Sequence, residues 1–435
     1  MASKRARSET RYAERSDGVE TKLALLRAAR DGGDYRLAEA LADSLKDGLT
    51  AERLLERSRV SAAGGPELGA AGWRPVTELP AGWAKWAAGW SHFQVVTLEE
   101  TAGLTREGEP VDVGLAAPVD WCLAREVSVA MADEATAAPR VVPSQVYGEE
   151  RTRGGSGGDV RTARLVWQAS VAPRGRATFV VFAGNPAAEL PHYVTDMVVR
   201  GEGVALEIEN EHVVATLSPQ TGQLERLRYK RAHGLELFAG GEGHGEPPHI
   251  DWAHDYLASN KFQKFRVTNW ERVRSYEVVR GPVCTVVRRW GFPHSPLHPV
   301  FTAARMLVDV SYVFYAGAPY FLKEGTMRAT QDFELNYLRD DEWVFSGYAF
   351  TDLLWMDEAG RAHEGPVPKE QAERMWGVGF FHRQSGDAFF SLRLRHEVEG
   401  SGGARLYHAD APALDYKGHG QLWSRWALRG DPRLR

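Results

Sequence analysis

The sequence lacks several features that assign a class of protein directly. It has two cysteines in 435 residues, Cys122 and Cys284, which excludes a disulfide scaffold and makes buried free thiols the simpler interpretation. No apolar run approaches the ~20 residues that span a bilayer. The chain begins with a polar, basic stretch instead of the apolar segment of a secretory signal. We therefore expect a cytoplasmic protein that does not enter a membrane.

An excess of charge of one sign is also missing. The formal net charge is −5, from 53 Lys and Arg residues against 58 Asp and Glu residues, so the chain has no basic excess and nucleic acid is not an expected partner. Apolar residues make up 43% and charged residues 26% of the sequence, which is ordinary for a globular protein with a sizeable core. At ~100–200 residues per domain, the length predicts two to four domains.

Tryptophan, in contrast, is plentiful. The chain has 14 of them, a composition that often accompanies all-β proteins that act on carbohydrates. Four follow a Gly/Ala/Pro-rich linker at 61–72, namely Trp73, Trp83, Trp86 and Trp90. A sugar-stacking platform is one interpretation of these four residues. Packing against the next domain is favoured, because aromatic side chains mostly serve in cores.

Hydrophobic periodicity divides most of the chain into four parts. Residues 1–20 are charged and predict a disordered tail, and helical spacing with glycine breaks predicts a helical hairpin over 21–60. Residues 73–200 contain regularly spaced short strands, which indicate a sandwich or barrel. Over 201–435 the strands lengthen and alternate in polarity, which predicts a large antiparallel sandwich. The sequence thus predicts a mainly β protein with a short helical N-terminal segment.

Several stretches resemble a known family. Residues 206–224, with a turn at 219–222, resemble the opening hairpin of galactose-mutarotase-like supersandwich domains, and residues 312–320 resemble a later hairpin of the same domains. Residues 142–148 and 179–186 look like the RIFT-barrel domain that precedes such a sandwich in exo-acting rhamnogalacturonan-lyase-like proteins.

The resemblance covers roughly residues 90–435. It implies a RIFT-barrel-like domain, a mutarotase-like supersandwich, and recognition or elimination of an acidic or rhamnose-containing polysaccharide. That family is similar in having an α/α-toroid domain after the sandwich, whereas no helical repeat follows it here. A partner chain that supplies a helical domain is therefore one alternative. No catalytic residue of the family can be matched one by one to this sequence.

The densest chemistry lies in residues 239–256. Behind a run of glycines, this stretch holds His244, His249, Asp251, Trp252, His254, Asp255 and Tyr256. Residues two apart share a strand face and residues three or four apart share a helix face, so some of the imidazole and carboxylate groups converge in either case. A histidine held by an aspartate is a proton-transfer unit. A divalent metal at His249, Asp251 and His254 is an alternative that the spacing does not favour, and a hydrogen-bonded polar loop is another.

Cations follow this stretch at Lys261, Arg288 and Arg289. In the β-elimination of a uronate, a cation offsets the carboxylate while a base removes the neighbouring proton, and the arginine fork suits the carboxylate. We therefore expect Arg288 or Arg289 as the carboxylate clamp and His254 or Tyr256 as the base. Surface salt bridges are the alternative interpretation of the two arginines.

Other side chains suit a glycosidase or a sugar-binding surface. Asp341 or Glu342, paired with Asp251 or Asp255, would supply the two carboxylates that glycoside hydrolysis needs. Lys323 and Glu324 are neighbours on a predicted strand and point to opposite faces, so one of them can reach a cleft. We expect substrate contacts from His244, Trp252, Lys261, Trp343, Gln421, Trp423 and Arg425.

These observations predict a carbohydrate-active protein whose partner is an oligo- or polysaccharide. A polysaccharide lyase is the leading hypothesis. A glycoside hydrolase and a non-catalytic carbohydrate-binding or assembly protein are the alternatives. No phosphate loop, nucleotide fingerprint or serine nucleophile elbow is present.

Overall fold

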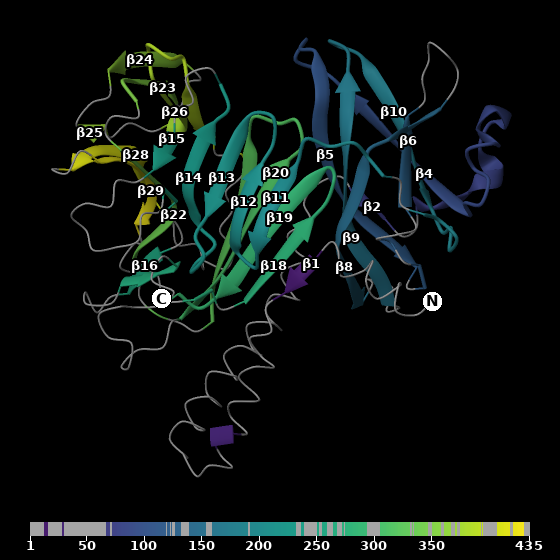
Figure 1. The fold of residues 1–435 in the computed structure, drawn as a ribbon, viewed down its shortest axis with the longest axis horizontal. Coiled ribbons are helices and arrows are strands. Elements are labelled where there is room, and N and C mark those ends of the chain that lie inside the picture. The colour runs from purple at the N-terminus through teal and green to yellow at the C-terminus, as the bar shows by residue number, and fades with distance from the viewer. Residues whose placement is uncertain are drawn as a thin grey trace.

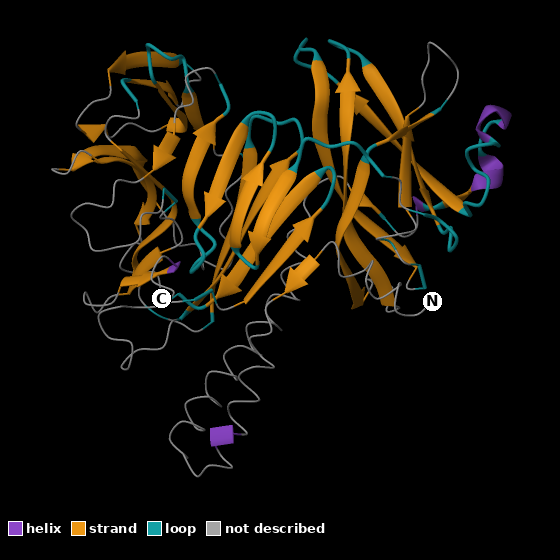
Figure 2. Cartoon of the chain, in the orientation of Figure 1, coloured by secondary structure: helices purple, strands orange, loops and turns teal. Residues whose placement is uncertain are grey.

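The computed structural model describes residues 13–15, 28–29, 67–69, 72–118, 120–121, 123, 127–131, 139–153, 159–189, 192–231, 236–238, 250–251, 255–258, 264–267, 272–273, 275–293, 305–330, 333, 335–346, 350–357, 361–366, 370–371, 375–392, 394, 407–417 and 421–429. This part of the chain is mainly β (Figures 1 and 2). Its strands pair antiparallel, except for one short parallel pairing of β2 with β5. The mainly β, antiparallel architecture predicted from the sequence is therefore confirmed.

Helical structure is scarce in the described residues. Two single 3₁₀ turns occur, η2 (Val76–Glu78) and η3 (Ala81–Trp83). Of the helical hairpin expected over 21–60, only Ala28 and Ala29 are described, and both are helical. None of the described helices is long and apolar enough to cross a membrane.

Two sheets form the first unit. One has the order β2-β5-β9-β8 and the other the order β3-β4-β10-β6-β7. The first consists of β2 (Glu67–Leu68), β5 (Arg106–Pro118), β9 (Asp159–Val171) and β8 (Ser144–Arg153). The second consists of β3 (Arg74–Pro75), β4 (His92–Glu99), β10 (Arg176–Ala183), β6 (Val127–Met131) and β7 (Arg140–Val142).

The core of the first unit lies between these two sheets. Leu165 and Trp167 of β9 and Phe179 and Val181 of β10 are fully buried in one cluster, because alternate residues of a strand face the same side. Burying aromatic and branched side chains of this size contributes roughly 1.5–3 kcal/mol each. The same alternation sends the even-numbered residues of β9 to the opposite face.

The tryptophans after the linker pack against this unit. Trp83, Trp86 and Trp90 are half-buried against a cluster that contains Phe182. The Trp73 indole N–H donates to the carbonyl of Ala116 at 2.8 Å. These contacts favour the packing interpretation over the sugar platform.

The sandwich begins with two five-stranded sheets. One has the order β11-β12-β13-β14-β15 and the other the order β1-β18-β19-β20-β21. The first consists of β11 (Val198–Glu202), β12 (Ala205–Glu209), β13 (Val213–Leu217), β14 (Leu224–Tyr229) and β15 (Glu236–Phe238). The second consists of β1 (Ala13–Arg15), β18 (Ser275–Arg280), β19 (Cys284–Gly291), β20 (Met306–Tyr315) and β21 (Phe321–Ala329).

Strand β1 differs from the expectation of a disordered tail over 1–20. Ala13–Arg15 pair antiparallel with β18, with Ala13 opposite Val279. The backbone groups on the free side of β18 can bond an added strand, so Ala13, Glu14 and Arg15 form a strand that their composition does not predict.

Two further sheets complete the sandwich. One has the order β17-β16-β22-β29-β28-β25 and the other the order β24-β23-β26-β27. The first consists of β17 (Lys264–Arg266), β16 (Asp255–Ala258), β22 (Leu335–Ser346), β29 (Gln421–Arg429), β28 (Tyr407–Lys417) and β25 (Glu370–Gln371). The second consists of β24 (Ala362–Pro366), β23 (Asp352–Asp357), β26 (Met375–Phe381) and β27 (Ala388–Leu392).

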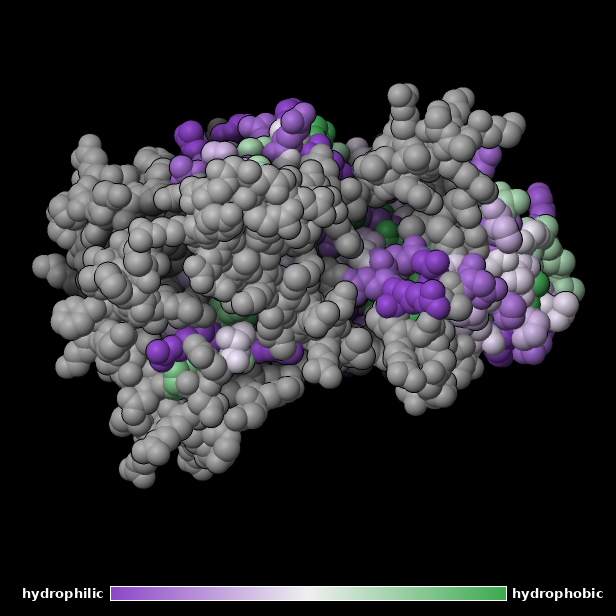
Figure 3. Space-filling model, turned by 90° about the horizontal axis from the view of Figure 1, so that it is seen from below, coloured by the Kyte–Doolittle hydropathy of each residue, from purple (hydrophilic) through white to green (hydrophobic). Residues whose placement is uncertain are grey.

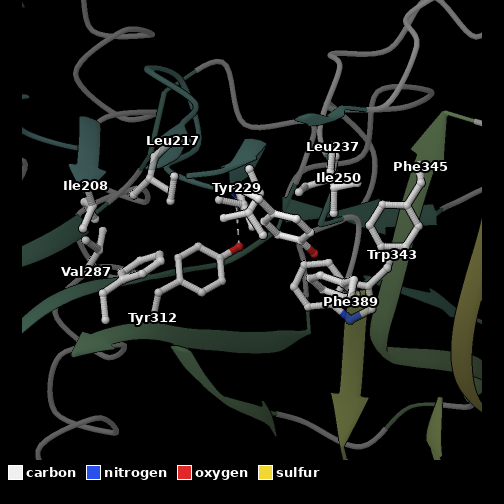
Figure 4. Packing of buried hydrophobic residues seen from close by; sticks show 14 of the residues in the cluster. Ile208, Leu217, Tyr229, Leu237, Ile250, Val287, Tyr312, Trp343, Phe345 and Phe389 are labelled. Carbon is white, nitrogen blue, oxygen red and sulfur yellow. Dashed lines mark hydrogen bonds between the residues drawn. The ribbon is translucent and has the colours of Figure 1, made fainter. Parts of the chain in front are cut away.

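One large core cluster joins the sheets of the sandwich. It includes Ile208 and Leu217 of the first sheet, Val287 and Tyr312 of the second, and Phe345 of the third (Figure 4). All five side chains are at most 2% exposed. Interiors of this kind are close-packed, so neighbouring sheets constrain one another.

The first unit and the sandwich meet through two sheet faces. Val166, on the outward face of β9, packs with Val279, Val283 and Cys284 of the β18–β19 hairpin. Four sheets therefore follow one another as layers (Figure 1). Their order is β3-β4-β10-β6-β7, then β2-β5-β9-β8, then β1-β18-β19-β20-β21, then β11-β12-β13-β14-β15. On the underside, the coloured surface toward the first unit includes a hydrophilic patch (Figure 3).

Gln145 of β8 connects the two units by hydrogen bonds. Its Oε1 accepts the backbone N–H of Val283 at 3.1 Å and that of Cys284 at 2.9 Å, and its Nε2 donates to the Cys284 carbonyl at 3.1 Å. Gly281 leaves the space for this side chain, because a Cβ there would lie 2.2 Å from the Gln145 amide.

Replacing Gln145 with leucine should destabilise the protein. The variant keeps a side chain of similar volume but leaves buried backbone groups without partners, which costs about 1–3 kcal/mol. Urea unfolding measures the change, with the exposed Gln220→Leu as a matched control that should change stability by less than about 0.5 kcal/mol. Equal unfolding midpoints for the two variants would contradict this role of Gln145.

Candidate functional site

The structure describes only part of the site expected from the sequence. Five expected residues lie outside the described residues, namely His244, His249, Trp252, His254 and Lys261. For four others only the strand backbone is described, namely Asp255 on β16 and Gln421, Trp423 and Arg425 on β29. The metal alternative rests on two of the undescribed histidines and stays a prediction. Among the described residues, no three His, Cys, Asp or Glu side chains form a group that could hold a metal ion.

Asp251 is described, and it lies in the interior of the sandwich. It is 1% exposed, and its backbone forms a bridge with Trp343. The Lys323 ammonium donates to Oδ1 at 2.8 Å, and the Tyr312 hydroxyl donates to Oδ2. The same ammonium lies 4.9 Å from the centre of the Trp343 ring. A carboxylate needs such partners in an interior, because burying an unpaired charge is costly.

A second layer of contacts closes this cluster. Gln223 Nε2 donates to the Asp251 carbonyl at 3.1 Å. The Arg289 guanidinium lies 4.6 Å from the centre of the Tyr312 ring and donates to the Thr221 carbonyl at 3.1 Å. Burial, and then the charge of Asp251, hold the pKa of the Tyr312 hydroxyl well above its ordinary value, so this phenol keeps its proton. The structure thus gathers Asp251, Arg289 and Trp343 around Tyr312 and Lys323, which the sequence did not group with them.

Tyr256 of β16 makes contacts that do not favour its expected role as a base. The side chain is fully buried, and the backbone N–H of Arg305 donates to its hydroxyl oxygen at 2.8 Å. Burial raises the pKa of Tyr256 to about 12, although that hydrogen bond lowers it. The phenolate is therefore a minor species near neutral pH.

Arg288 and Arg289 point to opposite faces of β19, as neighbouring strand residues do. Arg289 is 1% exposed within the sandwich. On the other face, Arg288 Nε lies 2.9 and 3.1 Å from the two carboxylate oxygens of Asp309, to which its fork donates. The pair does not form one clamp, and a protein carboxylate already occupies the fork of Arg288.

A different polar cluster lies where the first unit meets the sandwich. We call it the seam, and it comprises Asp112 on β5, Tyr147 on β8, Arg164 on β9 and Glu324 on β21. The Tyr147 hydroxyl donates to Asp112 Oδ2 at 2.6 Å, and Arg164 Nε donates to Oδ1 at 2.9 Å. Tyr147 and Arg164 are cross-strand partners. Each carboxylate oxygen of Asp112 is therefore held by a donor, which fixes its orientation.

Glu324 faces this group from edge strand β21. The residue is exposed to solvent, whereas its neighbour Lys323 points into the sandwich, as strand alternation predicts. No hydrogen bond or ion pair within the described part of the chain holds its carboxylate. Neighbouring protein atoms partly desolvate its carboxyl group and so raise its pKa; the charge of Arg164 lowers this pKa, and the charges of Asp112 and Asp309 raise it further.

Asp112 is perturbed in the same direction. Burial raises the pKa of its carboxyl group, and the charge of Arg164 and the hydrogen bond from Tyr147 offset part of that shift. The seam thus combines a solvent-reached carboxyl group with a second, oriented carboxylate, and burial raises the pKa of both. Displaced carboxyl pKa values in one cluster are typical of acid–base sites.

The sequence interpretation did not identify Asp112, Tyr147, Arg164 or Tyr312 as candidates for a site, whereas it expected one of Lys323 and Glu324 to reach a cleft. A signal was present for Asp112, because it is a charged residue between Val111 and Val113 in an apolar strand. The partners come from strands that are distant in sequence, so only the pairing of sheets brings them together.

Comparisons with known proteins assign no family. No family model matches the chain, and no curated protein matches it. Among solved structures, the chain is similar to a protein in the glycosyl hydrolase family 38 from Enterococcus faecalis, with 12% sequence identity, a TM-score of 0.44 and coverage of 92% of this chain. The chain spans 44% of the length of that protein. A likeness this distant identifies neither a family nor an activity.

Proposed function

We propose that this protein acts on carbohydrates and hydrolyses a glycosidic bond at the seam. The observation that carries the proposal is the pair of Glu324 and Asp112. Glu324 is reached by solvent and has a raised pKa, and Asp112 is oriented by Tyr147 and Arg164. Glycoside hydrolysis needs one carboxyl group that donates a proton and a second carboxylate on the other side of the bond.

In this proposal Glu324 protonates the leaving oxygen. Its raised pKa keeps a larger fraction protonated at mildly acidic pH than for an ordinary glutamic acid. Asp112 remains the ionised partner, because Arg164 and Tyr147 donate to its oxygens and stabilise the charge. Positive charge that develops at the sugar carbon in the transition state faces this carboxylate.

β-Elimination is the second candidate. It rests on His254 as base with an arginine clamp, and His254 lies outside the described residues. Of the two candidate clamps, Arg288 binds Asp309 and Arg289 is enclosed in the sandwich. We therefore base the proposal on the seam, whose carboxyl groups are described, and keep elimination as the alternative. A binding protein without activity is the remaining alternative.

Product analysis separates these functions. The purified protein is incubated with neutral polysaccharides and with pectic polysaccharides, and both reducing ends and absorbance in the near ultraviolet are recorded. Hydrolysis produces reducing ends without new absorbance, whereas elimination produces unsaturated ends that absorb. Binding without any product would contradict both enzymatic functions.

The pH dependence of hydrolysis should respond to charges beside Glu324. A general acid works only while protonated, so kcat/KM should fall as pH rises through the Glu324 pKa. Asp309→Asn removes a negative charge that raises this pKa and frees the positive charge of Arg288. Both changes favour the carboxylate, so the basic limb of the profile should move to lower pH. An unmoved limb, or a move to higher pH, would show that another group is the acid.

A further inference from the structure

We infer that Tyr320 forms a second sugar subsite beside the seam. This subsite binds a neutral sugar ring of the same glycan whose glycosidic bond is cleaved at Glu324. The inference rests on the proposed function for the position of that bond. It concerns a residue that contributes contact surface and takes no part in proton transfer.

The Tyr320 ring is both exposed and fixed. The side chain is 41% exposed, while its hydroxyl group donates to Glu109 Oε2 at 3.0 Å. Its ring and the ring of Tyr315 pack in a T-shaped arrangement, with 6.2 Å between the ring centres. The hydroxyl and this ring contact hold Tyr320 in place, while the exposed part of the side chain stays open to a ligand. An aromatic ring that is ordered before binding loses little conformational entropy on binding.

Large exposed aromatic rings are rare in the described residues. Besides Tyr320, the other is Phe390, which is 51% exposed on β27. Phe390 belongs to a different sheet from β21, and its ring covers Gly379. Tyr320, in contrast, precedes β21, the strand that carries Glu324.

Strand geometry relates Tyr320 to the proposed acid. Tyr320 lies just before β21, and its hydroxyl donates to Glu109 of β5, the strand that also carries Asp112, so Tyr320 is on the side of the seam. At ~3.3 Å per residue, Tyr320 and Glu324 are at most about 13 Å apart. Strand β21 is at the edge of its sheet, which leaves its outer side available to a glycan. A substrate of several sugar rings can therefore contact both residues.

The charged groups between Tyr320 and Glu324 favour a neutral substrate. Asp112 binds Arg164 of the seam, and Asp309 binds Arg288 beside it, so both arginines already have a carboxylate partner. Glu109 lies beside the Tyr320 hydroxyl, and Glu324 lies at the other end. Arg106, whose charge also acts on Tyr320, is paired with Glu100 at 3.5 Å. The carboxylate of a uronate would therefore face Glu109 and Glu324 while the nearby cations already hold carboxylates, and like charges repel. We therefore assign the subsite to neutral pyranose rings.

Binding measurements on a full-length Glu324→Gln protein test this assignment without turnover. Isothermal titration is performed with neutral tetrasaccharides of glucose, mannose, galactose and rhamnose, with the matching disaccharides, and with tetragalacturonate. We expect at least one neutral tetrasaccharide to bind more tightly than tetragalacturonate. Adding Tyr320→Ala should weaken that tetrasaccharide by about 3- to 10-fold, the size of one aromatic contact, and leave the disaccharide unchanged.

The Tyr320→Phe variant keeps the ring and serves as the matched control. We expect its affinity to stay within about twofold, whereas a loss as large as that of Tyr320→Ala would contradict stacking on the ring. The inference is also overturned if Tyr320→Ala leaves the tetrasaccharide affinity unchanged, if tetragalacturonate binds as tightly, or if no neutral tetrasaccharide binds. Ring-dependent binding by a wild-type protein that releases no reducing ends would retain the subsite and reject the proposed hydrolysis.

Discussion

Replacing Glu324 with glutamine is expected to lower kcat/KM for glycoside hydrolysis by about 10²–10⁴-fold, the usual contribution of a general acid. Glutamine has nearly the same shape but cannot supply the proton. The carboxylate is exposed and has no hydrogen bond within the described residues, so the fold should tolerate the change. Reducing-end release from the preferred neutral polysaccharide measures the rate, and thermal unfolding measures the stability.

Glu202→Gln is the matched control for this experiment. Glu202 is an exposed carboxylate at the end of β11, in a different sheet from β21. Its removal should leave the rate within about twofold and stability within about 0.5 kcal/mol. If Glu324→Gln behaves like Glu202→Gln, Glu324 is not the acid.

Breaking the interior ion pair is expected to cost about 3–5 kcal/mol of unfolding free energy. Asp251→Asn removes the carboxylate that the Lys323 ammonium contacts at 2.8 Å, and the side chain of Lys323 is only 11% exposed. The substitution also removes the charged acceptor of the Tyr312 hydroxyl. Denaturant unfolding, followed by tryptophan fluorescence, measures the loss, since Trp343 lies against the ammonium.

A double variant tests whether the loss comes from the unpaired charge. Combining Asp251→Asn with Lys323→Met removes both members of the pair. The double variant should lose clearly less stability than the sum of the two single variants, because neither charge is then buried alone. Strict additivity would indicate that the two groups act independently, despite their 2.8 Å contact.

The fold class was predictable because its signal is local. Alternation along Val308, Val310 and Tyr312 places these residues in the interior, as the structure confirms. The same rule separates Lys323 from Glu324, one facing the sandwich and the other the seam. Strand β1 was not predictable, because Ala13–Arg15 are a short segment without alternating polarity that pairs with the edge of β18.

The seam was not predictable, because it depends on which strands become neighbours. Asp112 and Glu324 belong to different sheets, and no spacing in the sequence relates them. The glycine-flanked histidines drew attention as a local concentration of reactive groups. Their one acidic neighbour whose side chain is described, Asp251, lies in the closed interior, with Lys323 and Tyr312 bound to it.

Arg288 and Arg289 are a second case in which the sequence could not predict the partners of a charged side chain. The sequence offered either of them as a carboxylate clamp, and strand alternation places them on opposite faces of β19. The structure adds that the Arg288 guanidinium donates to the Asp309 carboxylate and that the Arg289 guanidinium lies over the ring of Tyr312. Whether a charged residue serves a substrate or the fold depends on these partners.

A crystal structure of the Glu324→Gln protein soaked with its preferred neutral tetrasaccharide tests the central claim most directly. We expect a glycosidic oxygen within hydrogen-bonding distance of the amide that replaces the Glu324 carboxyl group, a sugar carbon facing Asp112, and a further ring on Tyr320. A tetrasaccharide bound against residues 244–256, with the seam unoccupied, would contradict the account.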